Sequence, residues 1–286
     1  MEKWFILLCV ILVICIFEWI REISTFKVTH YNVTSDKLKN LKSQRKILFL
    51  TDLHNNSYGK DNEKLLQAVR EQIPDLILIG GDMLVGEKGR SFEVAISFIT
   101  KLVEICPVYY ANGNHEQRMK LFPDLHGEGY SEYKETLQKC GVRFLENEYA
   151  DLIWDNVPIQ IHGLEIPYIN YHKFKKTTLS ESQLQEILGK ADQSKYQILM
   201  AHNPVYMEAY KKWGADLVLC GHLHGGIVRI PWLGGVISPQ FRLFPKHSGE
   251  LTKEGEQNMV VSKGLGTHTI KIRFLNMAEV IVLHIQ

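Results

Sequence analysis

Short apolar runs alternate with amphipathic stretches from Lys46 onward, and this alternation restricts the possible folds more than any other feature. The apolar runs are four or five residues long and rich in branched side chains, which is typical of buried strands. The stretches between them carry apolar residues at helical spacing. Chains with this order fold as strand–helix–strand units. The sequence therefore predicts an α/β protein.

The positions of these elements follow from the runs themselves. We predict strands at Ile47 to Thr51, Leu76 to Gly80, Val108 to Ala111, Ile159 to Gly163, Gln197 to Ala201 and Leu217 to Cys220. We predict helices at Asn62 to Gln72, Ser91 to Ile105 and Ser180 to Lys190, and the last begins with a capping-box pattern. Residues 258–286 alternate in a way that suits antiparallel strands.

Residues 4–20 form an apolar run that only Glu18 interrupts. A membrane-spanning helix needs about 17–25 such residues. Trp4 and Trp19 flank the run, and indole rings prefer the membrane interface. A secretory signal peptide is the alternative, but it needs small residues at a cleavage site, and the segment WIRE at 19–22 has none. We therefore predict an uncleaved, single-pass membrane anchor.

The chain divides into an anchor over residues 1–21, a Lys-rich connector over 22–45 and one domain over 46–286. The connector has room for a short strand at Phe26 to Val33. More basic residues follow the apolar run than precede it, which favours a cytoplasmic domain, but long domains cross membranes regardless of charge, so the side stays open. The formal net charge of +1 gives no global attraction to nucleic acid, and we expect no such partner.

Polar residues gather at the carboxyl ends of five predicted strands. In α/β sheets these ends form the crevice where ligands bind. The five segments are Thr51-Asp52-Leu53-His54, Gly80-Gly81-Asp82, Gly113-Asn114-His115-Glu116, Ala201-His202-Asn203 and Gly221-His222-Leu223-His224-Gly225-Gly226. We therefore expect nitrogen and oxygen ligands from five parts of the chain to meet at one place.

The spacing and chemistry of these segments suit a metal site. Residues two apart in an extended segment point to the same side, so Asp52 with His54, and His222 with His224, can act as pairs. The donors are imidazole, carboxylate and amide, which suits divalent manganese, iron, zinc or cobalt better than a structural zinc site. Each segment alone also fits an ordinary turn. The five segments in order favour one shared site.

The order D-x-H, G-D, G-N-H-E, H and G-H-x-H resembles the calcineurin-like metallophosphoesterase superfamily, from about Lys46 to the end of the chain. Residues 261–266 (VSKGLG) are similar to the closing segment of a membrane-anchored bacterial branch. The resemblance implies a four-layer α-β-β-α sandwich of two mixed β-sheets flanked by helices, here preceded by one transmembrane helix. It also implies hydrolysis of a phosphodiester, phosphomonoester or pyrophosphate bond by a hydroxide that two metal ions activate.

The resemblance further implies a role for each motif residue. One metal ion would be bound by Asp52, His54 and His224, and the other by Asn114, His202 and His222. Asp82 would bridge the two ions. His115 would not be a ligand but catalytic, protonating the leaving oxygen or stabilising charge beside the phosphate. Arg118 could contact a phosphate oxygen, but the interpretation that we favour is an exposed, solvated arginine.

One departure from the family pattern concerns the substrate. Protein-phosphatase members follow the G-D motif with a further Asp and Arg-Gly, whereas Asp82 is followed here by Met-Leu-Val-Gly. This departure argues against a phosphoprotein. An anchored site suggests instead a phosphorylated small molecule or a lipid-linked substrate at the membrane or envelope. The alternatives are a catalytically silent metal-binding scaffold on the same fold, and a structural membrane protein whose polar clusters are accidental.

Two predictions concern residues outside the motifs. His162 ends a predicted strand, and we expect it to be a packing residue. We expect the loops at 117–130 and 231–253 to shape the substrate pocket. The apolar residues of the second loop are equally compatible with contact to lipid; they are Trp232, Leu233, Phe241 and Phe244.

Overall fold

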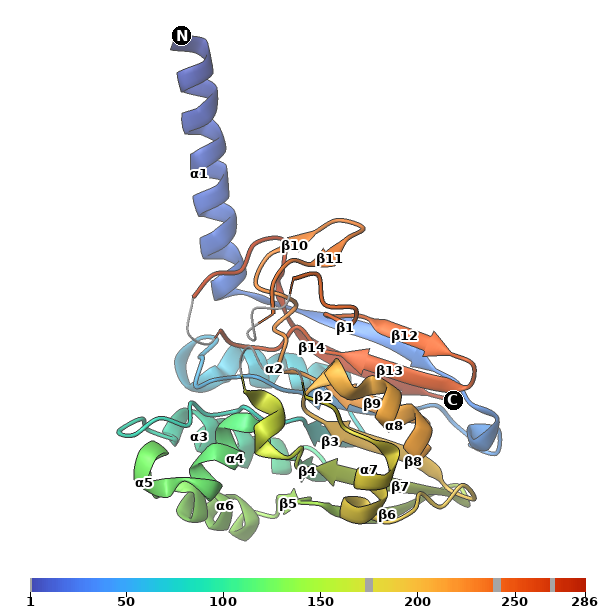
Figure 1. The fold of residues 1–286 in the computed structure, drawn as a ribbon. Helices are drawn as coiled ribbons and strands as arrows, with labels where there is room; N and C mark the ends of the chain where they lie inside the picture. Colours follow the sequence, from blue (N-terminus) through green and yellow to red (C-terminus); the bar gives the residue numbers. More distant parts are fainter. Residues whose placement is uncertain (1, 173–176, 239–242, 268–270) are drawn as a thin grey trace.

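Two six-stranded mixed sheets lie face to face in the computed structural model, which describes residues 2–172, 177–238, 243–267 and 271–286 (Figure 1). The strand order of the first sheet is β1 (Phe26–Val33), β14 (Ala278–Ile285), β2 (Arg45–Leu50), β3 (Leu76–Ile79), β4 (Val108–Tyr110) and β5 (Arg143–Phe144). The order of the second is β12 (Leu251–Glu254), β13 (Gln257–Val261), β9 (Leu217–Cys220), β8 (Tyr196–Ala201), β7 (Val157–Leu164) and β6 (Glu148–Trp154).

Helices cover the outer faces of both sheets, which confirms the predicted four-layer sandwich (Figure 1). The helices beside the first sheet are α2 (Glu63–Gln72), α3 (Glu93–Val103), α4 (Asn114–Leu121), α5 (Pro123–His126) and α6 (Tyr130–Lys139). Those beside the second are α7 (Glu181–Leu188) and α8 (Met207–Trp213). A two-stranded hairpin of β10 (Arg229–Ile230) and β11 (Gly234–Gly235) lies apart from both sheets.

The alternation of side chains along the strands produces these layers. In β2, Leu48 and Leu50 pack into a core with the helices of the first sheet, while Ile47 and Phe49 pack into the core between the two sheets. In β8, Leu199 packs instead against α8 on the outer face of the second sheet. Successive residues of a strand point to opposite faces, so a continuous apolar run serves two cores at once.

The predicted strands and helices are confirmed to within a few residues, and the capping box forms at α7, where the Ser180 and Gln183 side chains each accept the other's backbone N–H. The prediction of antiparallel pairing at the C-terminus is only partly correct. Strands β13 and β14 lie in different sheets, and each has one parallel and one antiparallel neighbour. Alternation reveals which face of a strand is buried but not which strand lies beside it.

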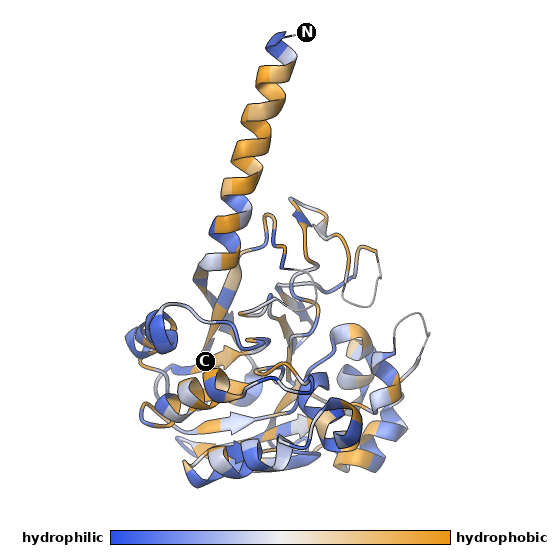
Figure 2. Ribbon diagram, turned by 90° about the vertical axis from the view of Figure 1, so that its left-hand side faces the viewer, coloured by the Kyte–Doolittle hydropathy of each residue, from blue (hydrophilic) through white to orange (hydrophobic). Residues whose placement is uncertain are grey.

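Helix α1 (Glu2–Ser24) projects from the domain and carries apolar residues around its whole circumference (Figure 2). Within the described residues it is the one helix long and apolar enough to cross a membrane. The expected strand over 26–33 is present as β1, and it pairs in parallel with β14 along its full length. This part of the predicted connector therefore belongs to the first sheet.

Candidate metal centre

Five loops at the carboxyl ends of β2, β3, β4, β8 and β9 meet at one site, as the motifs predict. Every aspartate and histidine that the motifs supply is buried: Asp52, His54, Asp82, His115, His202, His222 and His224. Their side chains form three overlapping groups, and the potential ligand atoms within each group lie within 4.8 Å of one another. This convergence contradicts the hypothesis that the polar clusters are accidental.

The first group consists of Asp52, His54 and His224. Nε2 of His54 lies 3.1 Å from Nε2 of His224, which in turn lies 3.4 Å from Oδ1 of Asp52. The Asp52 carboxylate is held in place by the Thr51 hydroxyl at 2.8 Å and by the backbone N–H of His222 at 3.1 Å. The lone pairs that a cation needs therefore already point toward a common centre.

The second group consists of Asp82, His202 and His222. Nε2 of His202 lies 3.1 Å from Oδ2 of Asp82, while its Nδ1 lies 2.7 Å from the carbonyl of Gly80, which orients the ring. Burial disfavours the charged imidazole, but the carboxylates of Asp82 and Asp52 outweigh it and raise the pKa of His202 to about 10. Positive charge is therefore strongly favoured at this point.

Asn114 begins helix α4, between Gly113 and His115. Its Oδ1 is a buried atom for which the described part of the chain offers no hydrogen-bond partner. Buried polar atoms are nearly always satisfied, so an oxygen of this kind is suited to bind a cation. Together with the imidazoles and carboxylates, it makes a donor set without thiolate, which fits borderline divalent cations such as manganese, iron, zinc or cobalt.

The backbone at the ligands differs from the extended conformation that we predicted. Asp52, His54, His222 and His224 all have positive φ, between 47° and 67°, and so does Asp82 at 53°. Few residues other than glycine adopt this conformation, and it clusters at functional sites. The D-x-H and H-x-H residues do meet at the site, but through tight turns. His222 and His224 consequently join different groups and do not act as a pair.

Glycines allow these turns to approach one another. A Cβ on Gly113 would lie 2.2 Å from Oδ1 of Asp82, and one on Gly221 would lie 2.2 Å from Oδ2 of Asp52. Any side chain at either position would therefore displace a carboxylate ligand. Glycine at these two positions therefore permits the close backbone approach that the site requires.

His115 is buried beside His54 and Asp82, and its Nδ1 has two hydrogen-bond partners. The backbone N–H of Gly86 donates to this atom at 2.9 Å, and Nη2 of Arg118 lies 3.1 Å from it. The ring centroids of His54 and His115 are 4.7 Å apart. Because Nδ1 acts as the acceptor, the neutral ring carries its proton on Nε2.

Arg118 is half-buried and is not the solvated surface arginine that we favoured over a phosphate contact. Its Nε donates to the Gly86 carbonyl at 2.6 Å, and its Nη2 contacts His115 as described. The turn at Gly86, which follows the G-D motif, accepts this hydrogen bond and so holds Arg118 beside His115. Arg118 therefore fixes the orientation of His115.

Glu116 is a site residue to which the motifs assigned no role. Its carboxylate accepts the backbone N–H groups of Asp82, Met83 and Gly113 at 2.8–3.0 Å and the Tyr110 hydroxyl at 2.7 Å. It thereby ties the loop of Asp82 to the loop of Asn114. Burial raises the pKa of Glu116 to about 7. The one feature of the sequence that could have indicated this role is the place of Glu116 in the G-N-H-E motif.

A second network, which the sequence did not reveal, supports the loop of His224. The Gly266 carbonyl lies 3.1 Å from Nδ1 of His224, and the fully buried Arg273 donates to the same carbonyl at 2.7 Å. Asn276 donates from Nδ2 to the His224 carbonyl at 2.7 Å, and its backbone N–H bonds the carboxylate of Glu22 in α1 at 2.8 Å. Isolated polar residues such as these form no recognisable motif.

His162 packs away from the metal centre, as expected. Its ring makes an edge contact with Trp213, and its Nε2 lies 3.1 Å from Oε1 of Gln160 and 2.9 Å from Oε1 of Gln197. Burial lowers the pKa of His162 to about 4, so the ring is neutral at physiological pH. These contacts confirm its role as a packing residue.

Comparison with known proteins agrees with this geometry. The sequence model of the calcineurin-like phosphoesterases matches residues 45–226, which include every motif residue. The chain is 28% identical over 225 residues to phosphodiesterase YaeI of Escherichia coli (strain K12), covering 78% of this chain and 75% of that protein. It is 24% identical over 241 residues to the uncharacterized metallophosphoesterase YkuE of Bacillus subtilis (strain 168), covering 83% and 77%.

Among solved structures, a phosphopantetheinyl hydrolase of Mycobacterium tuberculosis is similar over 79% of this chain and 92% of that chain, with 12% identity and a TM-score of 0.46. That likeness is too distant to bear on function. The family match, by contrast, spans most of the chain and contains the buried ligand groups. The chain belongs to the calcineurin-like phosphoesterase family and is a hydrolase that acts on phosphoester bonds.

Proposed function

We propose that the protein is a membrane-associated phosphodiester hydrolase that works with two divalent metal ions. The observation that carries this proposal is the position of Asp82 between two ligand groups. Its Oδ2 lies 3.8 Å from Nε2 of His54 in the first group and 3.1 Å from Nε2 of His202 in the second. A carboxylate in this position suits the shared ligand of a two-metal centre.

We assign the aspartates and histidines to the two ions by the groups that they form, and Asn114 by the role that the family resemblance implies. Asp52, His54 and His224 would hold one ion, and Asn114, His202 and His222 would hold the other, with Asp82 shared. When bound, the two cations would offset the charge of the phosphate and lower the pKa of the attacking water. His202 and His224 keep Nε2 toward the centre because their Nδ1 atoms face backbone carbonyls.

The chain supplies the proton for the leaving group through His115. Its Nδ1 accepts hydrogen bonds from Gly86 and Arg118, so the neutral ring carries its proton on Nε2. We assign this proton to the oxygen that departs from phosphorus. General acid catalysis of this kind is typically worth about 10²–10⁴-fold in rate.

The proposed substrate class rests on three observations. The relative YaeI is named a phosphodiesterase, which favours a diester over a monoester or pyrophosphate. The protein-phosphatase residues are missing after Asp82, which argues against a phosphoprotein. Helix α1 would hold the site at a membrane, which favours a lipid-linked phosphodiester.

Metal analysis combined with turnover of a generic aryl phosphodiester tests the proposal on the full chain in detergent. We expect two equivalents of divalent metal per chain, loss of turnover after dialysis against a chelator, and recovery with manganese. An aryl phosphomonoester and pyrophosphate should turn over more slowly. One equivalent of metal would overturn the two-metal proposal, and faster monoester turnover would overturn the diesterase proposal.

Asp82→Asn is the matching variant, because it removes charge from the shared ligand while keeping its shape. We expect it to lose metal and to abolish turnover. Asp192→Asn, at an exposed loop position, is the control and should leave both unchanged. Full metal content in Asp82→Asn would contradict the position given to Asp82.

A further inference from the structure

Large apolar side chains are exposed around the base of helix α1. We define the apolar rim as Trp232, Leu233, Leu243, Phe244, Ile272 and Leu275. The Trp232 side chain is 102% exposed relative to a free residue, and the other five are 42–67% exposed. Exposed large hydrophobic residues elsewhere in a soluble domain are usually scattered singly, whereas a contiguous set indicates a surface that contacts something apolar.

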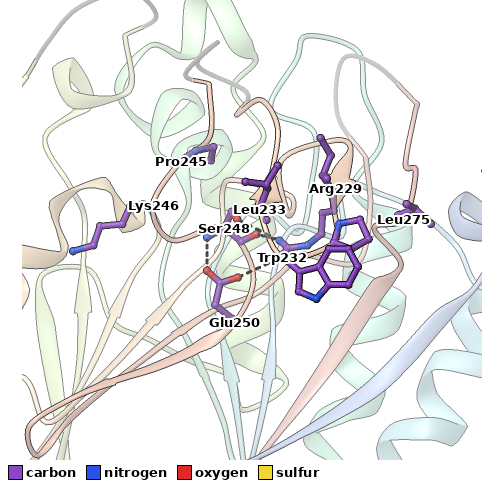
Figure 3. Close-up of a pocket in the computed structure, with 11 residues that line it drawn as sticks. Arg229, Trp232, Leu233, Pro245, Lys246, Ser248, Glu250 and Leu275 are labelled. Carbon is purple, nitrogen blue, oxygen red and sulfur yellow. Dashed lines mark hydrogen bonds and ion pairs between the residues drawn. The ribbon is translucent and has the colours of Figure 1, made fainter.

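The members of the apolar rim are neighbours in space. Trp232, Leu233 and Leu275 line one pocket of about 460 Å³ at hairpin β10–β11 (Figure 3). Leu243 pairs with Ile237, and the backbone N–H of Phe244 bonds the Val236 carbonyl at 2.9 Å, which brings both beside the hairpin. Phe241, which the sequence grouped with them, lies outside the described residues.

The position of the rim next to α1 indicates what covers it. Figures 1 and 2 show hairpin β10–β11 on the side of the domain from which α1 projects. Nε1 of Trp19 donates a 2.8 Å hydrogen bond to the carbonyl of Lys271, directly before Ile272. Because an indole at the end of a spanning helix sits at the membrane interface, this bond brings residues 271–272 to the same depth.

The charge of the surrounding segments is suited to a lipid surface. In the described residues 227–238, 243–250 and 271–277, Glu250 is the one acidic side chain, and it forms an ion pair with Arg229 at 3.1 Å. Lys246 and Lys271 are exposed beside the apolar rim. Apolar side chains flanked by lysines favour the interface of membranes that contain anionic lipids.

The hairpin is held rigidly against the loop that carries the metal ligands. Nη1 of Arg229 donates to the carbonyl of Ser248 at 2.9 Å (Figure 3). It also donates to the carbonyl of Gly225 at 3.2 Å, and Gly225 follows His224 directly. The Ser248 hydroxyl accepts the backbone N–H of Gly235 at 3.0 Å. The outward position of Trp232 therefore requires no rearrangement, and the metal centre keeps a fixed orientation relative to the rim.

We propose that the apolar rim rests on the surface of the same bilayer that α1 crosses, with anionic lipid headgroups at Lys246 and Lys271. The inference depends on the proposed membrane association and adds a second point of contact to the anchor. Two contacts fix the tilt of the domain relative to the bilayer plane, which a single helix leaves free. The metal centre then faces the headgroup region at one constant angle.

Quenching of tryptophan fluorescence by brominated lipid tests this surface on the full chain in lipid nanodiscs. The emission of Trp232 is isolated as the difference between the protein and its Trp232→Phe variant. In discs of phosphatidylcholine and phosphatidylglycerol brominated in the upper acyl chain, we expect Trp232 emission to fall by roughly half, because interfacial side chains reach this depth. Omitting phosphatidylglycerol should weaken the quenching.

Two other tryptophans make the result decisive. Trp154, in β6 at the end of the domain far from α1, should not be quenched, as measured with Trp154→Phe (Figure 1). Trp19, measured with Trp19→Phe, reports on the anchor. Quenching of Trp19 without quenching of Trp232 would overturn the apolar rim as a lipid contact. Quenching of neither would overturn both the anchorage and the rim.

Turnover of a soluble aryl phosphodiester in the same discs separates this inference from the hydrolase itself. Leu233→Ser and Phe244→Ser, which keep Trp232 as the reporter, should retain that turnover and lose the lipid contact, since neither residue belongs to the metal centre. Loss of the lipid contact with turnover intact would therefore support the apolar rim. Retention of the contact in both variants would overturn it.

Discussion

The carboxylate of Glu22, near the end of helix α1, accepts a 2.8 Å hydrogen bond from the backbone N–H of Asn276, whose side chain donates at 2.7 Å to the carbonyl of His224. Both Glu22 and Asn276 are buried. Two consecutive hydrogen bonds thus connect the apolar helix to the loop of a proposed metal ligand. Glu22 is in this sense a positioning residue for the metal centre.

Substitution of Glu22 should therefore weaken metal binding as well as stability. Glu22→Ala leaves the buried N–H of Asn276 without an acceptor, which costs about 1–3 kcal/mol. We expect a lower melting temperature and a weaker manganese affinity. Glu22→Gln keeps an accepting oxygen and should restore both, whereas Glu2→Ala, at the exposed start of the same helix, is the control. Unchanged manganese affinity in Glu22→Ala would contradict a positioning role.

Removal of His115 should slow turnover without removing metal. We expect His115→Ala to reduce kcat by about 10²–10⁴-fold, because the proton donor for the leaving oxygen is lost. Metal content, measured on the purified protein, should match that of the unsubstituted chain and of the control His126→Ala in α5. His115 also lies within ligand distance of His54 and Asp82, so a loss of metal would instead identify it as a ligand.

Arg118 should act on kcat and hardly on KM. Its Nη2 contacts Nδ1 of His115, so Arg118→Ala would release the ring and lower kcat by about tenfold, which corresponds to one hydrogen bond. Steady-state kinetics with the aryl phosphodiester separates the two constants. The exposed Arg90, changed to Ala, serves as the control. A rise in KM at constant kcat would show that Arg118 binds the phosphate directly.

His162 should make stability depend on pH in the acidic range. Burial lowers its pKa to about 4 from 6.5, so between these values the unfolded chain binds a proton that the folded chain does not. Stability therefore falls as pH decreases from 6.5 to 4, by at most about 3 kcal/mol from this residue. Unfolding of His162→Gln, followed over the same pH range, should lack this component. If the free energies of unfolding of the two proteins differ by the same amount at every pH, His162 does not contribute to the pH dependence.

The residues that meet at the candidate metal centre could be predicted because each belongs to a short motif that follows an apolar strand. Their backbone conformation could not, because it depends on contacts between loops that are distant in sequence. The backbone N–H of His54, for example, bonds the Asp82 carbonyl at 3.1 Å, and that of Asp52 bonds the Gly81 carbonyl at 2.9 Å. These bonds hold both residues at positive φ. Local propensity alone favours the extended form that we expected.

The residues that support the site could not be predicted from the sequence, for a related reason. Arg273, Asn276 and Glu22 are single polar residues whose partners lie up to 254 positions away. Nothing in their immediate neighbourhood distinguishes them from surface residues. Their role follows only from burial, since a buried polar group must find a partner wherever the fold brings one. Arg118 was misjudged in the same way, because the turn at Gly86 that receives it lies 32 positions earlier.

Strand β1 has a practical consequence for any soluble form of the enzyme. A chain cut at Lys46, where the family motifs begin, would lose the eight-residue ladder to β14 together with Val33 and Leu38 of the inter-sheet core. Strand β14, with the apolar sequence AEVIVLHI, would then be an unpaired edge strand, which favours aggregation. Cutting the chain between α1 and β1, near Thr25, would keep β1 and leave β14 paired on both sides.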